Sequence, residues 1–252
     1  MSVKSEKDIV ILREGGKKLA HVMAHVLSSI RIGMSAEEID RIAENEIKKI
    51  GGAPAFKGYK GDDSVFPASI CMSVNDEIVH GIPTKEKMIR DGDIIGIDIG
   101  LVYGGLITDM ARTVIAGEGD TTAKNLVRVT KDALLQGVRA VRAGARVGDI
   151  GHAIEEYVRP YRYGIIRELV GHGVGYALHE DPQIPNFGKA GTGEKLKAGI
   201  VIAIEPMITE KGETIVTQDD GWTICTKDGS RAAHFEDTIL VREDGYEILT
   251  SE

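Results

Sequence analysis

Apolar residues recur with a helical period in four parts of the chain. In the first part, residues 5–30, the apolar positions are Ile9, Leu12, Leu19, Val22, Val26 and Ile30, a spacing typical of an amphipathic helix. Ser35 and Glu38 form a capping box that predicts the start of a second helix, and Gly51–Gly52 predict its end. Two more helices are expected over residues 121–143 and 147–159.

Shorter apolar runs between these helices predict β-strands. They cover residues 68–75, 93–103, 107–116, 165–178, 200–209, 213–217 and 232–242. The chain therefore reads helices, strands, helices, strands, with no long linker and no low-complexity segment. This order predicts an α+β protein.

The same order also suggests an internal duplication. Arg31–Gly33 followed by Ile39 resembles Arg142–Gly144 followed by Ile150, and residues 86–98 resemble residues 194–205. A looser match relates residues 107–119 to residues 234–245. The alternative is chance similarity between strands rich in Ile and Val, but three matches in the same order favour duplication. We expect one domain over residues 1–252, with pseudo-symmetric halves of about 1–118 and 119–252.

One carboxylate stands in the middle of an apolar run. Asp98 lies within DGDIIGIDIG, residues 91–100, and a buried ionised carboxylate is costly unless something pairs with it. If a pseudo-twofold axis relates the halves, Asp98 and Asp109 face Glu205 and Glu236. Four carboxylates repel one another, and two divalent ions carry the four positive charges that match them. The alternative is a set of exposed edge charges or isolated salt bridges.

Histidines supply candidate nitrogen ligands and proton donors. His172 and His179 share the glycine-rich segment 169–185, and His80 follows another apolar run. His172 is the natural ligand. His179 lies seven residues later, so in an extended chain it would point to the opposite face and serve a different role. Oxygen ligands with one or two histidines suit Mn, Fe, Co or Zn, although a lone histidine is more often a core or surface residue.

Composition excludes several other classes of protein. The net charge of −8 argues against a nucleic-acid-binding protein with a broad basic surface. Two cysteines are too few for a disulfide scaffold, which favours a reduced, cytoplasmic setting. The first residues lack the apolar core of a signal peptide, and no apolar run of about 18 residues predicts a membrane span.

Six segments taken in order resemble the type I methionine aminopeptidases of the pita-bread metallopeptidase family. They are SVNDEIVHGIP (73–83), GDIIGIDIG (92–100), ITDMART (107–113), GHGVGYALHEDP (171–182), AIEPM (203–207) and AHFEDT (233–238). The resemblance covers nearly the whole chain. It implies the pita-bread fold, in which duplicated helices pack on a curved antiparallel sheet. The 33 positions from His172 to Glu205 resemble type I rather than the longer type II pattern.

The resemblance also implies roles for individual residues. It implies metal ligands at Asp98, Asp109, His172, Glu205 and Glu236, and substrate-contacting, catalytic histidines at His80 and His179. Glu205 is expected to transfer a proton as well. The methionine pocket is expected to include Tyr59, Cys71 and Trp222. The alternative for Trp222 is core packing, and the alternative for Cys71 is a role as a small buried hydrophobic residue.

The implied activity is metal-dependent removal of the N-terminal methionine from nascent proteins and peptides, with a small second residue preferred. Two divalent ions are implied, of Co, Mn, Fe or Zn. The expected partners are nascent polypeptide N-termini, met at the ribosome, and we expect a cytoplasmic monomer that binds neither nucleic acid nor membrane. The rivals are an Xaa-Pro aminopeptidase or dipeptidase of the same fold and a non-enzymatic binding member.

Two segments depart from the common family pattern. Residues 58–71 form a longer stretch than usual beside the expected methionine pocket. His234 and Asp237 flank Glu236 where Gln and His are common. The resemblance therefore does not fix the shape of the methionine pocket or the metal preference.

Overall fold

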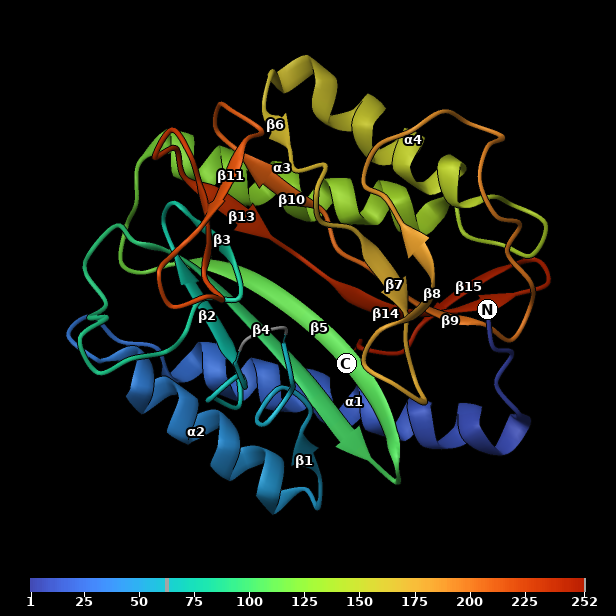
Figure 1. Ribbon diagram of the computed structural model, residues 1–252, viewed down its shortest axis with the longest axis horizontal. Coiled ribbons are helices and arrows are strands. Elements are labelled where there is room, and N and C mark those ends of the chain that lie inside the picture. The colour runs from blue at the N-terminus through green and yellow to red at the C-terminus, as the bar shows by residue number, and fades with distance from the viewer. Residues whose placement is uncertain (62–63, 252) are drawn as a thin grey trace.

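The computed structural model describes residues 1–61 and 64–251 (Figure 1). In the view of Figure 1, one helix pair lies along the lower edge of the strands and the other pair lies along the upper edge. They are α1 (Glu6–Ser29) with α2 (Ala36–Lys49), and α3 (Thr121–Arg139) with α4 (Val147–Val158). All four predicted helices are present. Asp62 and Asp63, which belong to the long stretch 58–71, lie outside the described residues.

Side-chain caps define where the helices begin. Ser35 and Glu38 form the predicted capping box, with the Glu38 N–H donating to Ser35 Oγ and the Ser35 N–H donating to the Glu38 carboxylate. Ser5 and Asp8 form an equivalent box at α1, and Asp120 caps α3. Helix α3 ends earlier than predicted, because the chain after Arg139 turns towards the sheet, where the Ala143 N–H donates to the Arg242 carbonyl.

The first half contributes a sheet built around two long strands. Strands β4 (Ile94–Tyr103) and β5 (Leu106–Ile115) pair antiparallel along their whole length. Strand β4 also pairs with β1 (Ala53–Pro54) and β2 (Cys71–Val74). The second half contributes an antiparallel sheet in the order β15-β14-β9-β7-β8. Its strands are β7 (Gly171–Gly173), β8 (Glu180–Ile184), β9 (Val201–Ile204), β14 (Asp237–Arg242) and β15 (Gly245–Ile248).

Two three-stranded sheets complete the layer. One joins β6 (Gly164–Ile165), β10 (Met207–Thr209) and β13 (Ala232–His234). The other joins β3 (Glu77–Val79), β11 (Ile215–Thr217) and β12 (Ile224–Thr226). A short 3-10 helix covers Arg159–Tyr161.

Three of the predicted strands prove to be interrupted. The run 200–209 breaks at Glu205–Pro206, and 232–242 breaks at Phe235–Glu236. Proline has no N–H to donate to a ladder, so Pro206 favours the first break. The run 165–178 contains only β6 and β7, separated by irregular chain. Two of the breaks therefore fall at predicted ligands, Glu205 and Glu236.

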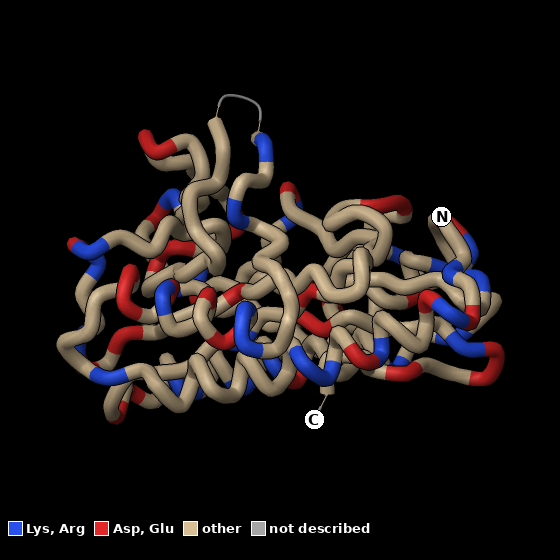
Figure 2. The backbone as a smooth tube through the Cα atoms, turned by 90° about the horizontal axis from the view of Figure 1, so that it is seen from below, with Lys and Arg blue, Asp and Glu red and all other residues tan. Residues whose placement is uncertain are grey.

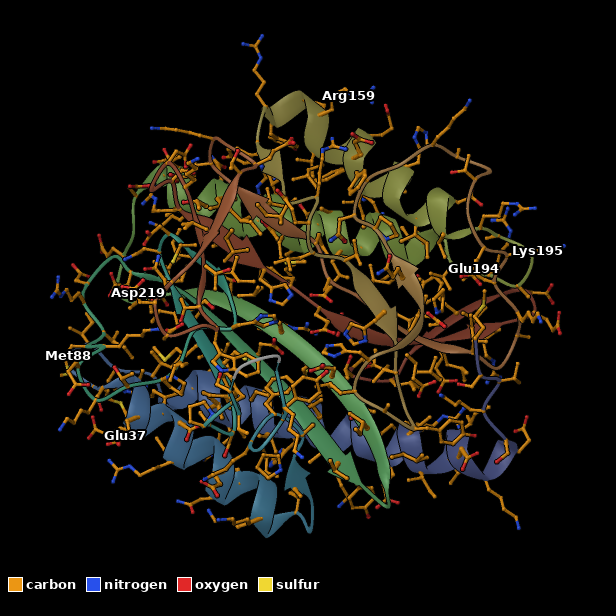
Figure 3. All side chains as sticks on the ribbon, viewed as in Figure 1. Glu37, Met88, Arg159, Glu194, Lys195 and Asp219 are labelled. Carbon is orange, nitrogen blue, oxygen red and sulfur yellow. The ribbon has the colours of Figure 1, made fainter. Side chains whose placement is uncertain are left out.

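The two halves repeat the same hydrogen bonds. Gly33 and Gly144 both adopt a positive φ, +88° and +87°, and their N–H groups donate to the Ile89 and Leu196 carbonyls. Isolated β-bridges join Ser35 to Met88 and Arg146 to Lys195. Met88 and Lys195 lie at opposite edges of the molecule, as a twofold relation requires (Figure 3).

These bonds also correct one detail of the sequence match. They make Ile89 equivalent to Leu196, an offset of 107 residues (196 − 89), which is the same offset as that from Gly92 to Gly199. Matching Glu86–Met88 to Glu194–Leu196 is therefore wrong by one residue.

Each helix pair covers its own part of the sheet. Residues of α1 and α2, such as Val22 and Ile39, form a buried cluster with Ile97 of β4. Residues of α3 and α4, such as Leu126 and Ile154, form another cluster with Ile202 of β9. Burial of these apolar faces stabilises the layered arrangement. Among the described residues, no helix is long and apolar enough to cross a membrane.

Candidate metal centre

The two halves meet through a short backbone contact between β5 and the residue before β14. Ala111 and Glu236 form an antiparallel bridge, in which the Glu236 N–H donates to the Ala111 carbonyl at 2.9 Å. Thr238 strengthens the junction, because its Oγ1 accepts from the Asp109 N–H and donates to the Asp109 carbonyl. This junction places Asp109 and Glu236 next to each other in the buried centre of the molecule.

The register of β4 and β5 brings Asp98 to the same place. Asp98 lies opposite Ala111, and Asp109 lies opposite Gly100. Asp98 and Asp109 are therefore diagonal neighbours on one face of the pair. A Cβ at Gly100 would meet the Phe56 ring at 2.6 Å. Gly100 therefore makes room for Phe56, while a Cβ at Gly96 would make only ordinary contacts.

His172 presents one ring nitrogen to the carboxylates. Its Nδ1 lies 3.0 Å from the Gly173 carbonyl, which can only accept a hydrogen bond, so Nδ1 carries the proton. The other nitrogen, Nε2, lies 3.6 Å from Glu205 Oε1 and 4.0 Å from Glu236 Oε1. A backbone carbonyl that fixes the tautomer in this way is typical of histidines that bind metals.

Burial and mutual repulsion oppose ionisation of the acidic groups in this cluster. Burial raises the pKa of Asp98 and Glu236 well above the usual range, and the carboxylates nearby raise it further. Burial likewise raises the pKa of Asp109 and of Glu205 to about 7. Within the described part of the chain, Asp98 Oδ1, Asp109 Oδ1 and Glu236 Oε1 have no hydrogen-bond partner.

These donors fit a divalent cation. Ligand atoms of Asp109, His172 and Glu236 all lie within 4.8 Å of one another, and the orphaned carboxylate oxygens need a positive partner. Oxygen donors with one imidazole suit first-row ions such as Mn, Fe, Co or Zn. The structure thus brings together all five residues expected as ligands: Asp98, Asp109, His172, Glu205 and Glu236.

The cluster lies where two cavities adjoin. An open cleft of about 820 Å³ is lined by His80, His172, His179 and Glu205. An inner pocket of about 80 Å³ is lined by the same four residues and by the remaining acids of the cluster. The cleft provides access from solvent, and the inner pocket offers a narrow space beside the acids.

The inner pocket has an apolar side that sequence analysis only partly identified. The expected residues Tyr59, Cys71 and Trp222 all line it. Phe56, Phe66 and Leu178 line it too and were missed. The apolar residues in the stretch 56–66 were the available signal. The rings of Phe66 and Trp222 meet edge to face, with centroids 5.2 Å apart.

The two other histidines also face the cleft. His179 was expected to point away from His172, and this was wrong. The chain turns back between β7 and β8, where Gly173 pairs with Glu180, so the rings of His172 and His179 lie 4.5 Å apart. His80 has a positive φ of +58°, which side-chain-bearing residues rarely adopt and which is common at functional sites. Burial lowers the pKa of His80 to about 4.

The two residues that depart from the family pattern face different ways. His234 is buried, and its Nε2 lies 3.3 Å from Glu205 Oε2. Asp237 lies on the other side, where its Oδ1 accepts hydrogen bonds from Arg112 Nη2 and Thr250 Oγ1. Only His234 therefore reaches the cluster.

Comparison with known proteins identifies the class that this fold and cluster define. The profile of metallopeptidase family M24 matches residues 10–243. A curated relative from Bacillus subtilis, methionine aminopeptidase 1, is 44% identical over 98% of each chain. The solved structure of methionine aminopeptidase from Thermotoga maritima is 45% identical, covers 100% of both chains and superposes with a TM-score of 0.96. The chain therefore belongs to metallopeptidase family M24 and, within it, to the methionine aminopeptidases.

A more distant solved structure has the same fold. Xaa-Pro dipeptidase from Bacillus anthracis is 25% identical, with a TM-score of 0.80. The similarity covers 99% of this chain but 62% of that one. The expected pita-bread architecture is confirmed by both solved structures.

Proposed function

We propose that this protein removes the N-terminal methionine from peptides and nascent polypeptides by metal-dependent hydrolysis, and that it prefers a small second residue. One observation carries the proposal. Five candidate ligands, of which Asp109, His172 and Glu236 are buried, converge beside a narrow pocket with one apolar side, which adjoins an open cleft. Such a site can hold one terminal side chain next to the reacting bond.

The cluster would hold two divalent ions, of Mn, Fe, Co or Zn, through Asp98, Asp109, His172, Glu205 and Glu236. When bound, such ions polarise a carbonyl and activate water for attack near neutral pH. The two ions would match the four carboxylates in charge. The ligands come from both halves of the chain, so residues 1–118 and 119–252 would act as one catalytic domain.

Three side chains would transfer the proton and contact the substrate. Glu205 would accept a proton from the attacking water and pass it to the leaving amine, as a general base and then a general acid. His179 would donate a hydrogen bond to the carbonyl oxygen as negative charge develops there. His80 would contact the scissile amide nitrogen. Burial lowers the pKa of both histidines, which favours the neutral imidazole, a ring that both donates and accepts a hydrogen bond.

The inner pocket would bind the methionine side chain. Tyr59, Cys71 and Trp222 line it together with Phe56, Phe66 and Leu178. An unbranched thioether adapts to a narrow space and makes favourable contacts with aromatic rings. With the side chain in this pocket, the free α-amine of the substrate would lie beside Asp98, Asp109 and the metal that these residues would hold, which would restrict hydrolysis to N-termini.

Substrate discrimination tests this proposal against its rivals. The metal-free protein would be assayed with and without Mn²⁺ or Co²⁺ on Met-Ala-Ser, Met-Lys-Ser and Ala-Pro peptides. We expect metal-dependent release of methionine from Met-Ala-Ser, and much slower release from Met-Lys-Ser. Preference for Ala-Pro would support the Xaa-Pro peptidase, and no turnover of any peptide would support a binding protein.

We also propose where the protein acts and which molecules it meets there. The partners would be nascent N-termini at the ribosome, and the protein would act as a monomer in the cytoplasm without binding nucleic acid. The net charge is −8, and Figure 2 shows Lys and Arg interspersed with Asp and Glu in that view. Co-sedimentation with translating and salt-washed ribosomes, beside light scattering of the free protein, tests this setting.

A further inference from the structure

His234 lies against Glu205 because of the pairing between β10 and β13. In that pair, His234 is directly opposite Met207, two residues after Glu205. The Phe235 N–H also donates to the Pro206 carbonyl. The two segments therefore remain side by side past the end of the ladder, where Glu205 leaves the sheet.

The backbone of His234 is held firmly in this position. Its N–H donates to Thr113 Oγ1 at 2.9 Å, and Thr113 Oγ1 donates back to the His234 carbonyl at 2.7 Å. The side chain is 4% exposed. A side chain that is buried on a fixed backbone has little freedom, so its contact with Glu205 is a consequence of the fold.

The two oxygens of Glu205 face different imidazoles. Oε1 lies 3.6 Å from His172 Nε2, on the side of the metal ligands. Oε2 lies 3.3 Å from His234 Nε2. That nitrogen is buried and has no hydrogen-bond partner within the described residues. At 3.3 Å the ring nitrogen is close enough to the carboxylate oxygen for a hydrogen bond, but its N–H is not aligned with that oxygen in this structure. A rotation of either side chain would let the N–H donate to the ionised carboxylate and satisfy both groups.

We propose that His234 is a positioning residue for Glu205, donating from Nε2–H to Oε2 and thereby directing Oε1 towards the metal ions. The inference rests on the proposed function, because it takes Glu205 as a ligand. His234 was identified from the sequence only as an unusual neighbour of Glu236. The partner that its ring contacts is instead Glu205, which lies 29 positions earlier (234 − 205).

A matched pair of variants separates the hydrogen bond from the packing. His234→Leu keeps a buried side chain without a donor, whereas His234→Gln keeps an N–H donor. His152→Gln, on α4 and outside both cavities, controls for the loss of a histidine. Each chelator-treated protein would be titrated with Co²⁺ by calorimetry, and its thermal unfolding would be followed to check folding.

We expect His234→Leu to bind Co²⁺ about 10–100-fold more weakly at unchanged stoichiometry, as loss of a partner behind a metal ligand typically does. His234→Gln and His152→Gln should stay within a few-fold of wild type. Unchanged affinity in a folded His234→Leu would overturn the proposal. So would equal losses in the Leu and Gln variants with an altered Co²⁺ absorption spectrum, because His234 would then be a direct ligand.

A measurement on the unmodified protein covers the case in which His234→Leu does not fold. In the Zn²⁺-loaded protein, ¹⁵N spectra of the histidine rings report which nitrogen carries the proton. We expect a proton on Nε2 of His234, and an unprotonated Nε2 would refute the hydrogen bond. Failure of the proposed function would appear separately, as a wild-type protein that binds metal but releases no methionine.

Discussion

The hydroxyl group of Tyr59 lies 2.8 Å from Nδ1 of His179, and the two rings meet edge to face with centroids 5.4 Å apart. If the hydroxyl donates to Nδ1, the ring proton of His179 resides on Nε2. The imidazole then has a donor available for the substrate carbonyl. Tyr59, which was expected only to line the methionine pocket, thus contacts His179, the residue proposed to stabilise the oxyanion.

Removing this hydroxyl should slow catalysis more than it weakens binding. Tyr59→Phe keeps the ring but loses one hydrogen bond, which is worth about 1 kcal/mol. We therefore expect kcat for Met-Ala-Ser to fall roughly five- to tenfold, with little change in KM. Steady-state kinetics on both proteins measure this. A rise in KM at constant kcat would show that Tyr59 acts only through the pocket.

Substitutions of the neighbouring residues His179 and His172 should have different effects. His179→Ala should lower kcat by about 10²–10³, as loss of an oxyanion donor typically does, while its metal stoichiometry stays unchanged. His172→Ala should weaken metal binding itself. Calorimetric metal titration beside kinetics separates the two results. Loss of metal from His179→Ala, to the extent seen for His172→Ala, would make His179 a ligand and reject this division.

A single carboxylate should be dispensable for folding but not for hydrolysis. Asp98→Asn replaces an acid whose pKa is raised by burial of its carboxyl group and by the neighbouring Asp109 and Glu205, so the metal-free variant should unfold at a higher temperature than metal-free wild type. Its peptide hydrolysis should be abolished even with excess metal. Differential scanning calorimetry and methionine release provide the two measurements. Turnover near that of wild type would show that Asp98 is not needed.

The metal-free protein should lose stability as the pH rises. Burial raises the folded-state pKa of Asp109 and Glu205 to about 7, whereas the unfolded values are about 4. Between these values the folded state binds more protons, so stability falls as pH rises, by at most about 1.4 kcal/mol per pH unit for each group. The stabilisation that these two protonated acids give the folded state is fully present below about pH 4 and is lost above about pH 7.

Chemical unfolding of chelator-treated protein between pH 4.5 and 7.5 measures this slope. Asp109→Asn should have a shallower slope than wild type. Stability that rises across this range would mean that the cluster is ionised without metal.

Sequence patterns were sufficient where the structure is local. The four helices follow from side chains within a few turns of one another, and Ser35 with Glu38 caps α2 as expected. The acids of the cluster were also identifiable, because an ionisable residue such as Asp98 contrasts with the apolar run around it. Local spacing and polarity carried this information.

Contacts set by distant pairing could not be derived in the same way. His172 and His179 lie together only because the chain turns back between β7 and β8, whereas an extended chain would separate them. His234 reaches Glu205 through the register of β10 with β13. Strands of two or three residues, such as β1 and β3, are too short to show an alternation of apolar and polar residues. Their stability comes from pairing with strands distant in the sequence.

Dependence of hydrolysis on metal held by this cluster is tested by titrating the metal-free enzyme with Co²⁺ and measuring release of free methionine from Met-Ala-Ser. We expect no release without metal and a rate that rises with added Co²⁺ until two ions are bound per chain. Asp109→Asn, measured beside it, should stay inactive throughout. Full activity in the presence of chelator, or in Asp109→Asn, would contradict a reaction that depends on metal held by this cluster.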